Sequence, residues 1–354
     1  MNPENRVTIA VDAEGGDHAP KEIIRGSLQA VRKTGDSLIL VGHEKKIEKY
    51  LKRIGGSESS VRVVHAPERI EMGDHPAAAI RRKPNSSIVV AAKLVRDGEA
   101  DAFFSAGSTG ASVCVASLIL GRAPGIDRPA IATIMPTIGG HVVLLDAGAN
   151  VDCTVENLLQ FAVMGSVYAR DVLGVANPRV GLLSIGEEPT KGNEVVKQTH
   201  RLLAEGNLNF IGNIEGRPLF AGEADVVVCD GFMGNVVLKV AEGVVDLLKL
   251  GVKEKLVSKP FYWPMLLGLA PGLMRLHKEL DWTEQAGAPL LGVNGICIIG
   301  HGSSKAKAIR SAVRIAGKAA RNDIQKKISL SLEDSTPNQV IQMAENAQTA
   351  SHNV

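Results

Sequence analysis

Short runs of β-branched and aliphatic residues alternate along the chain with longer segments in which apolar residues recur at helical spacing. The runs predict strands at residues 7–12, 38–42, 61–65, 102–105, 130–135, 142–146, 180–185, 209–212, 226–230 and 297–299. The longer segments predict helices at 19–33, 43–54, 86–97, 109–121, 154–173, 191–204, 233–256 and 303–327. Strands that alternate with helices are typical of βαβ units, so the pattern predicts an α/β fold with a mostly parallel sheet.

Two of the predicted strands depart from the parallel pattern. Residues 130–135 and 142–146 are joined by a short turn with two adjacent glycines, which is typical of a hairpin. The sheet is therefore expected to be mixed. A single domain is expected over residues 6–328, because the chain becomes polar and rich in Asn, Gln and Ser over 329–354, where we expect a weak helix or a loose tail.

Composition narrows the classes of function. The 40 basic and 38 acidic side chains give a formal net charge of +2, so no nucleic acid is expected as a partner. Aromatic residues make up only 3% of the chain, so the core must consist mainly of Val, Ile, Leu and Ala. Four of the few aromatic residues nevertheless lie in one short stretch: Phe261, Tyr262, Trp263 and Trp282.

The cysteines and the N-terminus indicate a cytoplasmic protein. Cys114, Cys153, Cys229 and Cys297 show no metal-ligand or redox spacing, which suits a reducing compartment. The N-terminal residues are polar and lead directly into a strand, so no signal peptide is expected. Residues 102–121 carry no charge, but interrupting Gly, Ser and Thr residues favour a strand, a turn and a helix over a membrane span.

Polar residues gather where the predicted strands end, which is where the ligand crevice of an open α/β sheet lies. The first of these loops, residues 12–20, turns on two glycines and enters a helix. Asp12, Asp17 and His18 in this loop could form a metal site or an acid/base site, whereas a capped turn explains the glycines but not the acids and histidine gathered there. No metal is expected, because no further cluster of ligands follows at regular spacing.

The loop after the predicted strand 102–105 indicates an anion site. Gly107, Ser108, Thr109 and Gly110 lead onto an apolar helix, whose free amides and dipole favour a phosphate. The alternative is a serine-capped helix behind a short turn. The loop lacks the lysine of a P-loop and the GxSxG pattern of hydrolases, and the chain has no GxGxxG. Hydrolysis of nucleoside triphosphates, acyl-serine chemistry and a dinucleotide cofactor are therefore disfavoured.

Three further loops follow the strands that end near residues 146, 185 and 230. They carry these polar residues: Asp146 and Asn150, then Glu187, Lys191 and Asn193, then Asp230 and Asn235. Lys191 is expected at the start of a helix, where the dipole favours anions, so a bound anion could compensate for its charge. The alternative is a solvated lysine paired with a neighbouring glutamate. Together the loops predict a polar crevice for phosphate or a phosphoryl-bearing ligand.

With these loops the chain closely resembles the bacterial phosphate acyltransferase family, whose members transfer acyl groups from acyl carrier protein to phosphate. The resemblance extends from about Val7 to Ala320. Its long matching stretches include IAVDAEGGDHAPKEI, FFSAGSTGA, VLLDAGANVDC, VGLLSIGEEPTKGNE, ADVVVCDGFMGNVVLK and GAPLLGVNGICIIGHGSS. Glu14 stands where Met is expected in the first stretch, and it adds an acid beside the expected site.

The resemblance implies a three-layer αβα arrangement, related to phosphotransacetylases and to the isocitrate dehydrogenase-like fold, with a protruding helical hairpin over about 250–282. It implies an enzyme that forms acyl phosphate from fatty acyl carrier protein and inorganic phosphate. The product would feed a membrane glycerol-3-phosphate acyltransferase at the start of phospholipid synthesis. The resemblance also implies a homodimer, peripheral association with the inner face of the cytoplasmic membrane, and no cofactor.

The chemistry requires positioning and charge stabilisation more than a strong base, because a thiol with a pKa near ~8.5 leaves as thiolate with modest help. We hypothesise that phosphate binds at residues 107–110 and that Lys191 neutralises it. Asn235, Asn193 or His18 would polarise the thioester carbonyl. A short-chain phosphotransacetylase that uses a CoA thioester is an open alternative, as is a membrane-associated scaffold without chemistry of its own.

Two surface regions are expected to meet partners. Because acyl carrier protein is acidic, Arg81, Arg82 and Lys83 are expected to dock it. A second basic group lies on the predicted helix 43–54, for which a merely solvated face is favoured over docking: Lys45, Lys46, Lys49, Lys52 and Arg53. The aromatic segment is too interrupted and too charged at its end to span a membrane. Its apolar side chains, flanked by Lys and Arg, are expected to contact the membrane surface instead: Phe261, Tyr262, Trp263, Leu266, Leu267 and Leu273. Burial in a dimer or in the core is the alternative.

Overall fold

The computed structural model describes residues 6–56, 59–279 and 287–335. The strands form an 11-stranded sheet in the order β3-β2-β1-β4-β11-β10-β5-β6-β9-β7-β8. They are β1 Thr8–Asp12, β2 Ser37–Gly42, β3 Val61–His65, β4 Ala102–Ser105, β5 Ala130–Thr137, β6 Gly140–Leu145, β7 Val180–Leu183, β8 Phe210–Ile214, β9 Val226–Val228, β10 Ala288–Leu291 and β11 Ile296–Ile299. The expected α/β class with a mixed, mostly parallel sheet is confirmed.

Two parallel blocks make up the sheet, and antiparallel strands join them. Strands β3, β2, β1, β4 and β11 form the first block, and β6, β9, β7 and β8 form the second. Between the blocks, β10 pairs antiparallel with β11 and β5. Strand β5 pairs antiparallel with β6, in the register Ala132↔Leu145 to Thr137↔Gly140, which confirms the expected hairpin.

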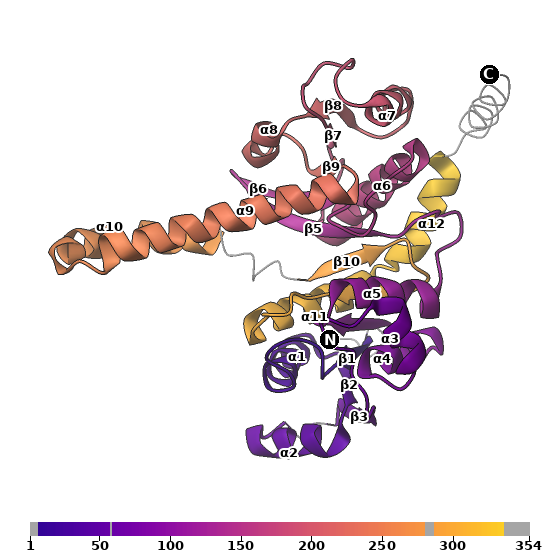
Figure 1. The fold of residues 1–354 in the computed structure, drawn as a ribbon, viewed down its shortest axis with the longest axis vertical. Helices are drawn as coiled ribbons and strands as arrows, with labels where there is room; N and C mark the ends of the chain where they lie inside the picture. The colour runs from indigo at the N-terminus through magenta and orange to yellow at the C-terminus, as the bar shows by residue number, and fades with distance from the viewer. Residues whose placement is uncertain (1–5, 57–58, 280–286, 336–354) are drawn as a thin grey trace.

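Helices cover both faces of the sheet, as Figure 1 shows. The helices of the described residues, of which α10 lies away from the sheet, are α1 Lys21–Thr34, α2 Glu44–Ile54, α3 Pro76–Arg82, α4 Ser87–Arg96, α5 Thr109–Val115, α6 Val155–Tyr168, α7 Glu194–Glu205, α8 Gly216–Ala221, α9 Gly231–Val252, α10 Trp263–Glu279, α11 Ala306–Arg321 and α12 Ile324–Ser335. Successive side chains of a strand point to opposite faces. Ile9 and Val11 of β1 therefore join the cluster with α1, α6 and α11, whereas Ala10 joins the one with α4 and α5.

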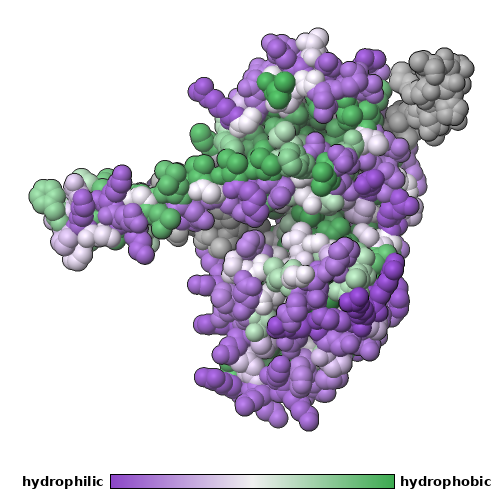
Figure 2. All heavy atoms as spheres, viewed as in Figure 1, coloured by the Kyte–Doolittle hydropathy of each residue, from purple (hydrophilic) through white to green (hydrophobic). Residues whose placement is uncertain are grey.

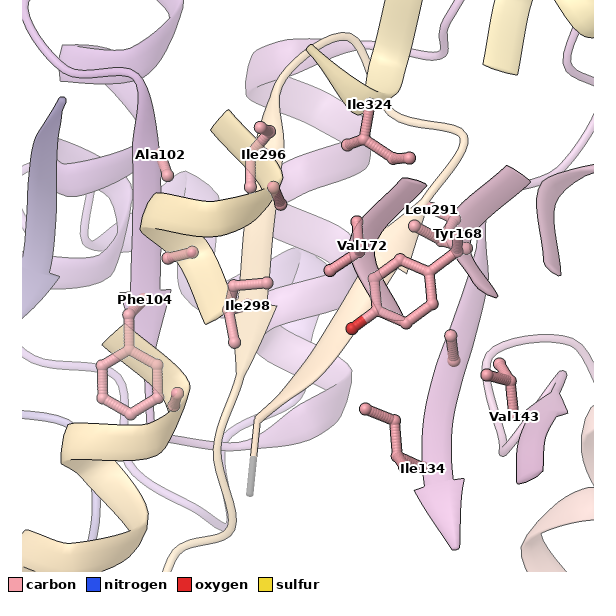
Figure 3. Packing of buried hydrophobic residues seen from close by; sticks show 14 of the residues in the cluster. Ala102, Phe104, Ile134, Val143, Tyr168, Val172, Leu291, Ile296, Ile298 and Ile324 are labelled. Atoms are coloured by element: carbon pink, nitrogen blue, oxygen red, sulfur yellow. The ribbon is translucent and has the colours of Figure 1, made fainter. Parts of the chain in front are cut away.

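The first of these clusters continues across the sheet from one parallel block to the other. Figure 3 shows Phe104 and Ile298 of the first block and Val143 of the second within it, together with Tyr168 of α6. These side chains are almost fully buried. The sheet thus lies between two helical layers, which confirms the expected three-layer arrangement and a largely aliphatic core.

The structure departs from the predicted elements in a few places. Strand β10 and the short helices α3 and α8 were not expected. The single helix expected over 303–327 is two helices, because Asp323 adopts a positive φ of 47° between α11 and α12. The weak helix expected after 329 is the end of α12, and residues 336–354 lie outside the described part of the chain.

Helices α9 and α10 form an arm that projects from the sheet (Figure 1). A π-helical turn at Lys253–Val257 and a 3₁₀ turn at Pro260–Tyr262 connect them. The arm is the expected protruding hairpin, but its first limb, α9, begins at Gly231, well before the expected bounds of about 250–282. Trp282 lies outside the described residues. Within the described helices, none is both long and apolar enough to cross a bilayer. The uncharged segment 102–121 forms β4, α5 and a π-helical turn, as expected.

Candidate active site

The carboxyl ends of β1, β4 and β11 are neighbours in the sheet, and the three loops that follow them are hydrogen-bonded together. The amide of Gly300 donates to the carbonyl oxygen of Ser105 at 2.7 Å, and the amide of Asp17 donates to that of Gly302 at 2.9 Å. The structure thus brings together the two predicted loops that carry Asp12 and Gly107. It adds a third loop, residues 300–304, to which the sequence analysis gave no role although it is a glycine-rich stretch after a predicted strand.

Asp12 lies beneath the surface of this loop cluster, with 3% of its area exposed. Its Oδ2 accepts from the hydroxyl of Ser105 at 2.7 Å, and its Oδ1 accepts from the amide of Glu14 at 3.2 Å. Burial raises the pKa of the Asp12 carboxyl, and hydrogen bonds from Ser87, Ser105 and Glu14 act in the opposite direction. Asp17 and His18, by contrast, are exposed.

The predicted phosphate loop, residues 107–110, has a buried part and an exposed part. The amide of Gly107 donates to Oγ of Ser105 at 3.1 Å, so this buried residue does not offer its amide to a ligand, contrary to the expectation. Ser108 caps α5 by accepting from the amide of Ala111. Thr109 and Gly110 are exposed, and their amides make no hydrogen bond to another described residue. The free donors therefore belong to the first turn of α5.

Asp146 at the end of β6 organises a second cluster. Its side chain is fully buried. The carboxylate accepts from the amide of Ile131 at 3.0 Å, the amides of Gly148 and Ala149 at 3.1 and 3.0 Å, and both the amide and Nδ2 of Asn150 at 2.7 and 2.8 Å. Burial raises the pKa of Asp146, and these donors act in the opposite direction. Asp146 and Asn150 therefore hold the loop from beneath, rather than lining the crevice as expected.

The first turn of α9 rests on this loop. Asp230 caps the helix by accepting from the amide of Met233 at 2.7 Å. Gly234 lies so close to the carbonyl of Asp146 that a side chain there would collide with it. Asn235 is exposed and borders Gly148, since a methyl group on Gly148 would lie 3.5 Å from Cβ of Asn235. The helix thus presents the Asn235 amide beside a rigid loop.

Lys191 lies in the exposed loop after β7. The amide of Lys191 donates to the carbonyl of Glu188 at 3.0 Å, and Asn193 caps α7 by accepting from the amide of Val196 at 2.9 Å. Glu187 and Lys191 are both exposed. The Lys191 ammonium group makes no ion pair with any described residue, so the alternative interpretation of a lysine paired with a neighbouring glutamate finds no support.

The Asp146 loop packs through apolar side chains against the elements that carry the first group of loops. Ala147 lies in the same buried cluster as Phe103 of β4 and Val115 of α5, and Ala149 and Leu238 pack against it. The Lys191 loop lies further along the sheet. Since β9 and β7 follow β6 in order, that loop begins roughly 10 Å from the end of β6, at about 4.8 Å per strand. The site residues therefore fall into two groups. The Asp146 loop packs beside the loop that follows β4, whereas the Lys191 loop follows β7, six positions from β4 in the sheet order.

The nearby thiols are unsuited to nucleophilic attack. Burial raises the pKa of Cys153 to about 11 and holds the pKa of Cys229 well above its ordinary value. Burial also raises the pKa of Cys114. A thiol with a raised pKa stays protonated near neutral pH, and the thiolate is the reactive form. The arrangement therefore favours chemistry by charge stabilisation over a covalent cysteine intermediate.

Of the expected docking residues, Arg81 and Arg82 end α3 and Lys83 directly follows it; α3 packs against α5. Arg81 and Arg82 are exposed. Lys83 donates to Asp74 at 2.6 Å and holds the pKa of that carboxyl below its usual value. A methyl group on Gly110 would lie 3.3 Å from Pro76, the first residue of α3. The helix that carries the two free arginines thus begins beside the exposed end of the phosphate loop.

The arm carries exposed apolar surface along its length. Phe261 is 86% exposed, Leu267 76% and Trp263 55%. Figure 2 shows a hydrophobic band along the α9 limb of the arm. A cavity of about 540 Å³ lies near the tip, lined by Val257, Trp263, Leu266, Leu267, Ala270, Leu273 and Met274.

The chain is similar in sequence to one family model and to curated proteins that share one name. A family model described as "Fatty acid synthesis protein" matches residues 7–327. The phosphate acyltransferase of Desulfitobacterium hafniense (strain DSM 10664 / DCB-2) is 52% identical over 325 residues, which cover 92% of this chain and 97% of that protein. The phosphate acyltransferase of Pelotomaculum thermopropionicum is 53% identical over 328 residues, covering 92% and 95%.

Solved structures share the fold at low identity. A phosphotransacetylase from Streptococcus pyogenes superposes with a TM-score of 0.61 at 18% identity, covering 89% of this chain and 94% of that one. A branched-chain phosphotransacylase from Enterococcus faecalis V583 gives 0.54 at 14% identity, covering 89% and 99%. At such identities the likeness shows the fold alone, and it agrees with the expected relation to phosphotransacetylases.

Proposed function

The chain belongs to the family of fatty acid synthesis proteins that includes the phosphate acyltransferases, and from this premise we propose that it transfers a fatty acyl group from acyl carrier protein to inorganic phosphate. The observation that carries the proposal is Lys191, an exposed cation without an ion-pair partner among the described residues, in a glycine-containing loop at the carboxyl edge of the sheet. A free cation at this edge suits an anionic substrate.

The reaction needs no covalent enzyme intermediate. A phosphate oxygen attacks the thioester carbon, which becomes tetrahedral, and the carbonyl oxygen becomes an oxyanion. The carbonyl double bond then re-forms as the C–S bond breaks, and the electron pair of that bond leaves with the carrier thiolate. Acyl phosphate remains. Lys191 would offset the charge of the attacking phosphate, and the exposed Asn235 amide would donate to the oxyanion. The exposed Thr109 and Gly110 amides would hold the phosphate, with Asn193 and His18 as further candidate donors.

Product formation tests this assignment. The purified chain is mixed with phosphate and either palmitoyl-carrier protein or acetyl-CoA, and acyl phosphate is measured as hydroxamate alongside the released thiol. Phosphate-dependent product from the carrier substrate is expected. Product from acetyl-CoA alone would instead indicate a short-chain phosphotransacetylase, and no product from either donor would indicate a scaffold.

Charge reversal on α3 should weaken carrier binding. Arg81→Glu combined with Arg82→Glu is expected to raise KM for the acyl carrier protein substrate about tenfold, because docking charges mainly govern association with an acidic partner. KM for phosphate should not change. The control is Lys45→Glu combined with Lys49→Glu, the same charge change on exposed residues of α2. An equal effect of both pairs, or an equal rise in the phosphate KM, would rule out a docking site on α3.

The arm is the proposed membrane contact of a peripherally bound enzyme at the inner face of the cytoplasmic membrane, ahead of a membrane glycerol-3-phosphate acyltransferase. Trp263→Glu and Leu267→Glu should each reduce co-sedimentation with anionic vesicles at least tenfold, since burying one large apolar side chain contributes about 1.5–3 kcal/mol. Leu118→Glu, at a leucine that is 59% exposed outside the arm, is the control. Unchanged sedimentation of both arm variants would refute the contact.

A second copy of the chain is the proposed partner for the α9 face. Val240 is 60% exposed and Leu247 68%, and Val244, one turn from Val240 on the same helix, is also exposed. An apolar face of this length suits a homodimer. Light scattering of the purified chain in the absence of lipid measures this directly, and a mass of one chain at micromolar concentration would contradict it.

A further inference from the structure

Asp12 is a buried carboxylate at the site to which the proposed chemistry gives no role. It lies directly beneath the turn that precedes the phosphate loop, and it pairs with no cation among the described residues. An ionised carboxyl without a counter-charge is costly to bury unless several donors satisfy it. Its donors here come from three separate segments: Glu14 after β1, Ser105 at the end of β4 and Ser87 at the start of α4.

The hydrogen bonds form a directed chain from Asp12 to the loop. A serine hydroxyl has one proton and two lone pairs. Because the Ser105 proton goes to Oδ2 of Asp12 at 2.7 Å, a lone pair of Ser105 faces the Gly107 amide, which donates to it at 3.1 Å. Asp12 therefore sets the rotamer of Ser105, and Ser105 in turn fixes the peptide group that leads into Ser108 and the first turn of α5.

The loop after β1 closes onto the same atoms. A methyl group on Gly15 would lie 2.5 Å from Oδ2 of Asp12 and 3.0 Å from the Gly107 nitrogen. The backbone at Gly15 thus packs directly against the carboxylate, and a side chain there would collide with it. Ser105 is itself fully buried, so it stands between Asp12 and any ligand on the exposed end of the loop. Asp12 acts through Ser105 rather than by touching substrate.

We propose that Asp12 and Ser105 are positioning residues that hold the Gly107 turn, and with it the free amides of Thr109 and Gly110, in the geometry that binds phosphate. The inference rests on the proposed function, in which phosphate binds at these amides. A preorganised loop binds an anion more tightly because its donors need not be ordered on binding. Loss of the chain of hydrogen bonds should therefore weaken phosphate binding selectively.

Kinetics of Ser105→Ala, Asp12→Asn and Asp12→Ala test the proposal. Ser105→Ala should raise KM for phosphate about tenfold and leave KM for the acyl donor unchanged. Asp12→Asn keeps an oxygen that can accept from Ser105, so its phosphate KM should rise less than that of Asp12→Ala. Two controls match the substitutions at buried positions away from the loops. In Ser27→Ala the lost hydroxyl bonds within α1, and in Asp36→Asn the carboxyl accepts from Arg321.

Binding of inorganic phosphate alone separates this inference from the proposed function. Phosphate should raise the thermal midpoint of the wild-type chain and of both controls, and it should raise that of Ser105→Ala much less. If the wild type makes acyl phosphate but Ser105→Ala keeps its phosphate KM and its phosphate-induced shift, the positioning role is overturned and the function stands. If the wild type makes no acyl phosphate but the shift depends on Ser105, the function is overturned and the positioning role stands.

Discussion

Replacing Lys191 by alanine is expected to lower kcat/KM for phosphate by about 10²- to 10³-fold, the range seen when one preorganised donor to a developing charge is removed. The reason is that the ammonium group is the free cation of the exposed loop after β7. The loop itself should survive, because its geometry depends on the backbone bond from Lys191 to Glu188 and on the Asn193 cap. The loss should therefore appear in turnover and not in stability.

The measurement is steady-state kinetics with varied phosphate at saturating acyl donor, together with a thermal midpoint for each variant. Lys197→Ala is the matched control, because this lysine lies on α7 only six positions further along. Lys191→Arg keeps the charge but not the point-like geometry of the ammonium group, so it should recover only part of the activity. Wild-type turnover by folded Lys191→Ala would remove the lysine from the mechanism.

The sequence predicted the sheet well because buried parallel strands leave a strong local signal. Runs such as Val7–Asp12 are both β-branched and continuous, and each is followed by a turn residue. Strand β10 was missed because Ala288–Leu291 is short and contains Pro289, which argues against a strand from local preference. The break in the helix predicted over 303–327 was missed because it depends on one residue, Asp323, with a left-handed backbone conformation. The spacing of apolar residues does not indicate the backbone conformation at a single position.

The site was harder to predict, because the same residue types serve a ligand or the fold. Asp12 is the last residue of β1 and Asp146 directly follows β6, and both were expected to line a crevice. Their roles depend on how many backbone amides converge on each carboxylate, which only the tertiary structure determines. The Gly107 amide was expected to bind phosphate for the same reason, yet the neighbouring Ser105 hydroxyl accepts it. Lys191 and Asn235 are exposed, although Lys191 precedes α7 instead of starting it, and their part in the reaction stays a prediction.

Asp146→Ala should have the largest effect on stability of any substitution in these loops. It would leave the buried amides of Ile131 and Asn150 and the half-buried amide of Ala149 without an acceptor. Each orphaned donor costs about 1–3 kcal/mol, although partial relaxation keeps the sum below additivity. We expect the free energy of unfolding to fall by about 4–5 kcal/mol, the upper range for point substitutions. Domains are typically stable by about 5–15 kcal/mol, so the variant should be close to unfolding.

Urea unfolding followed by circular dichroism measures this loss as a fall in the midpoint at constant slope. Asp152→Ala, at an exposed position just beyond the same loop, is the control and should stay within about 0.5 kcal/mol of the wild type. Asp146→Asn keeps one acceptor oxygen and should lie between the two. Because Gly234 packs on the Asp146 carbonyl, whatever loosens this loop also moves the first turn of α9. The folded fraction of Asp146→Asn should therefore lose turnover as well, since Asn235 is carried on that turn. A midpoint for Asp146→Ala equal to that of Asp152→Ala would show that the buried carboxylate does not hold the two halves of the site together.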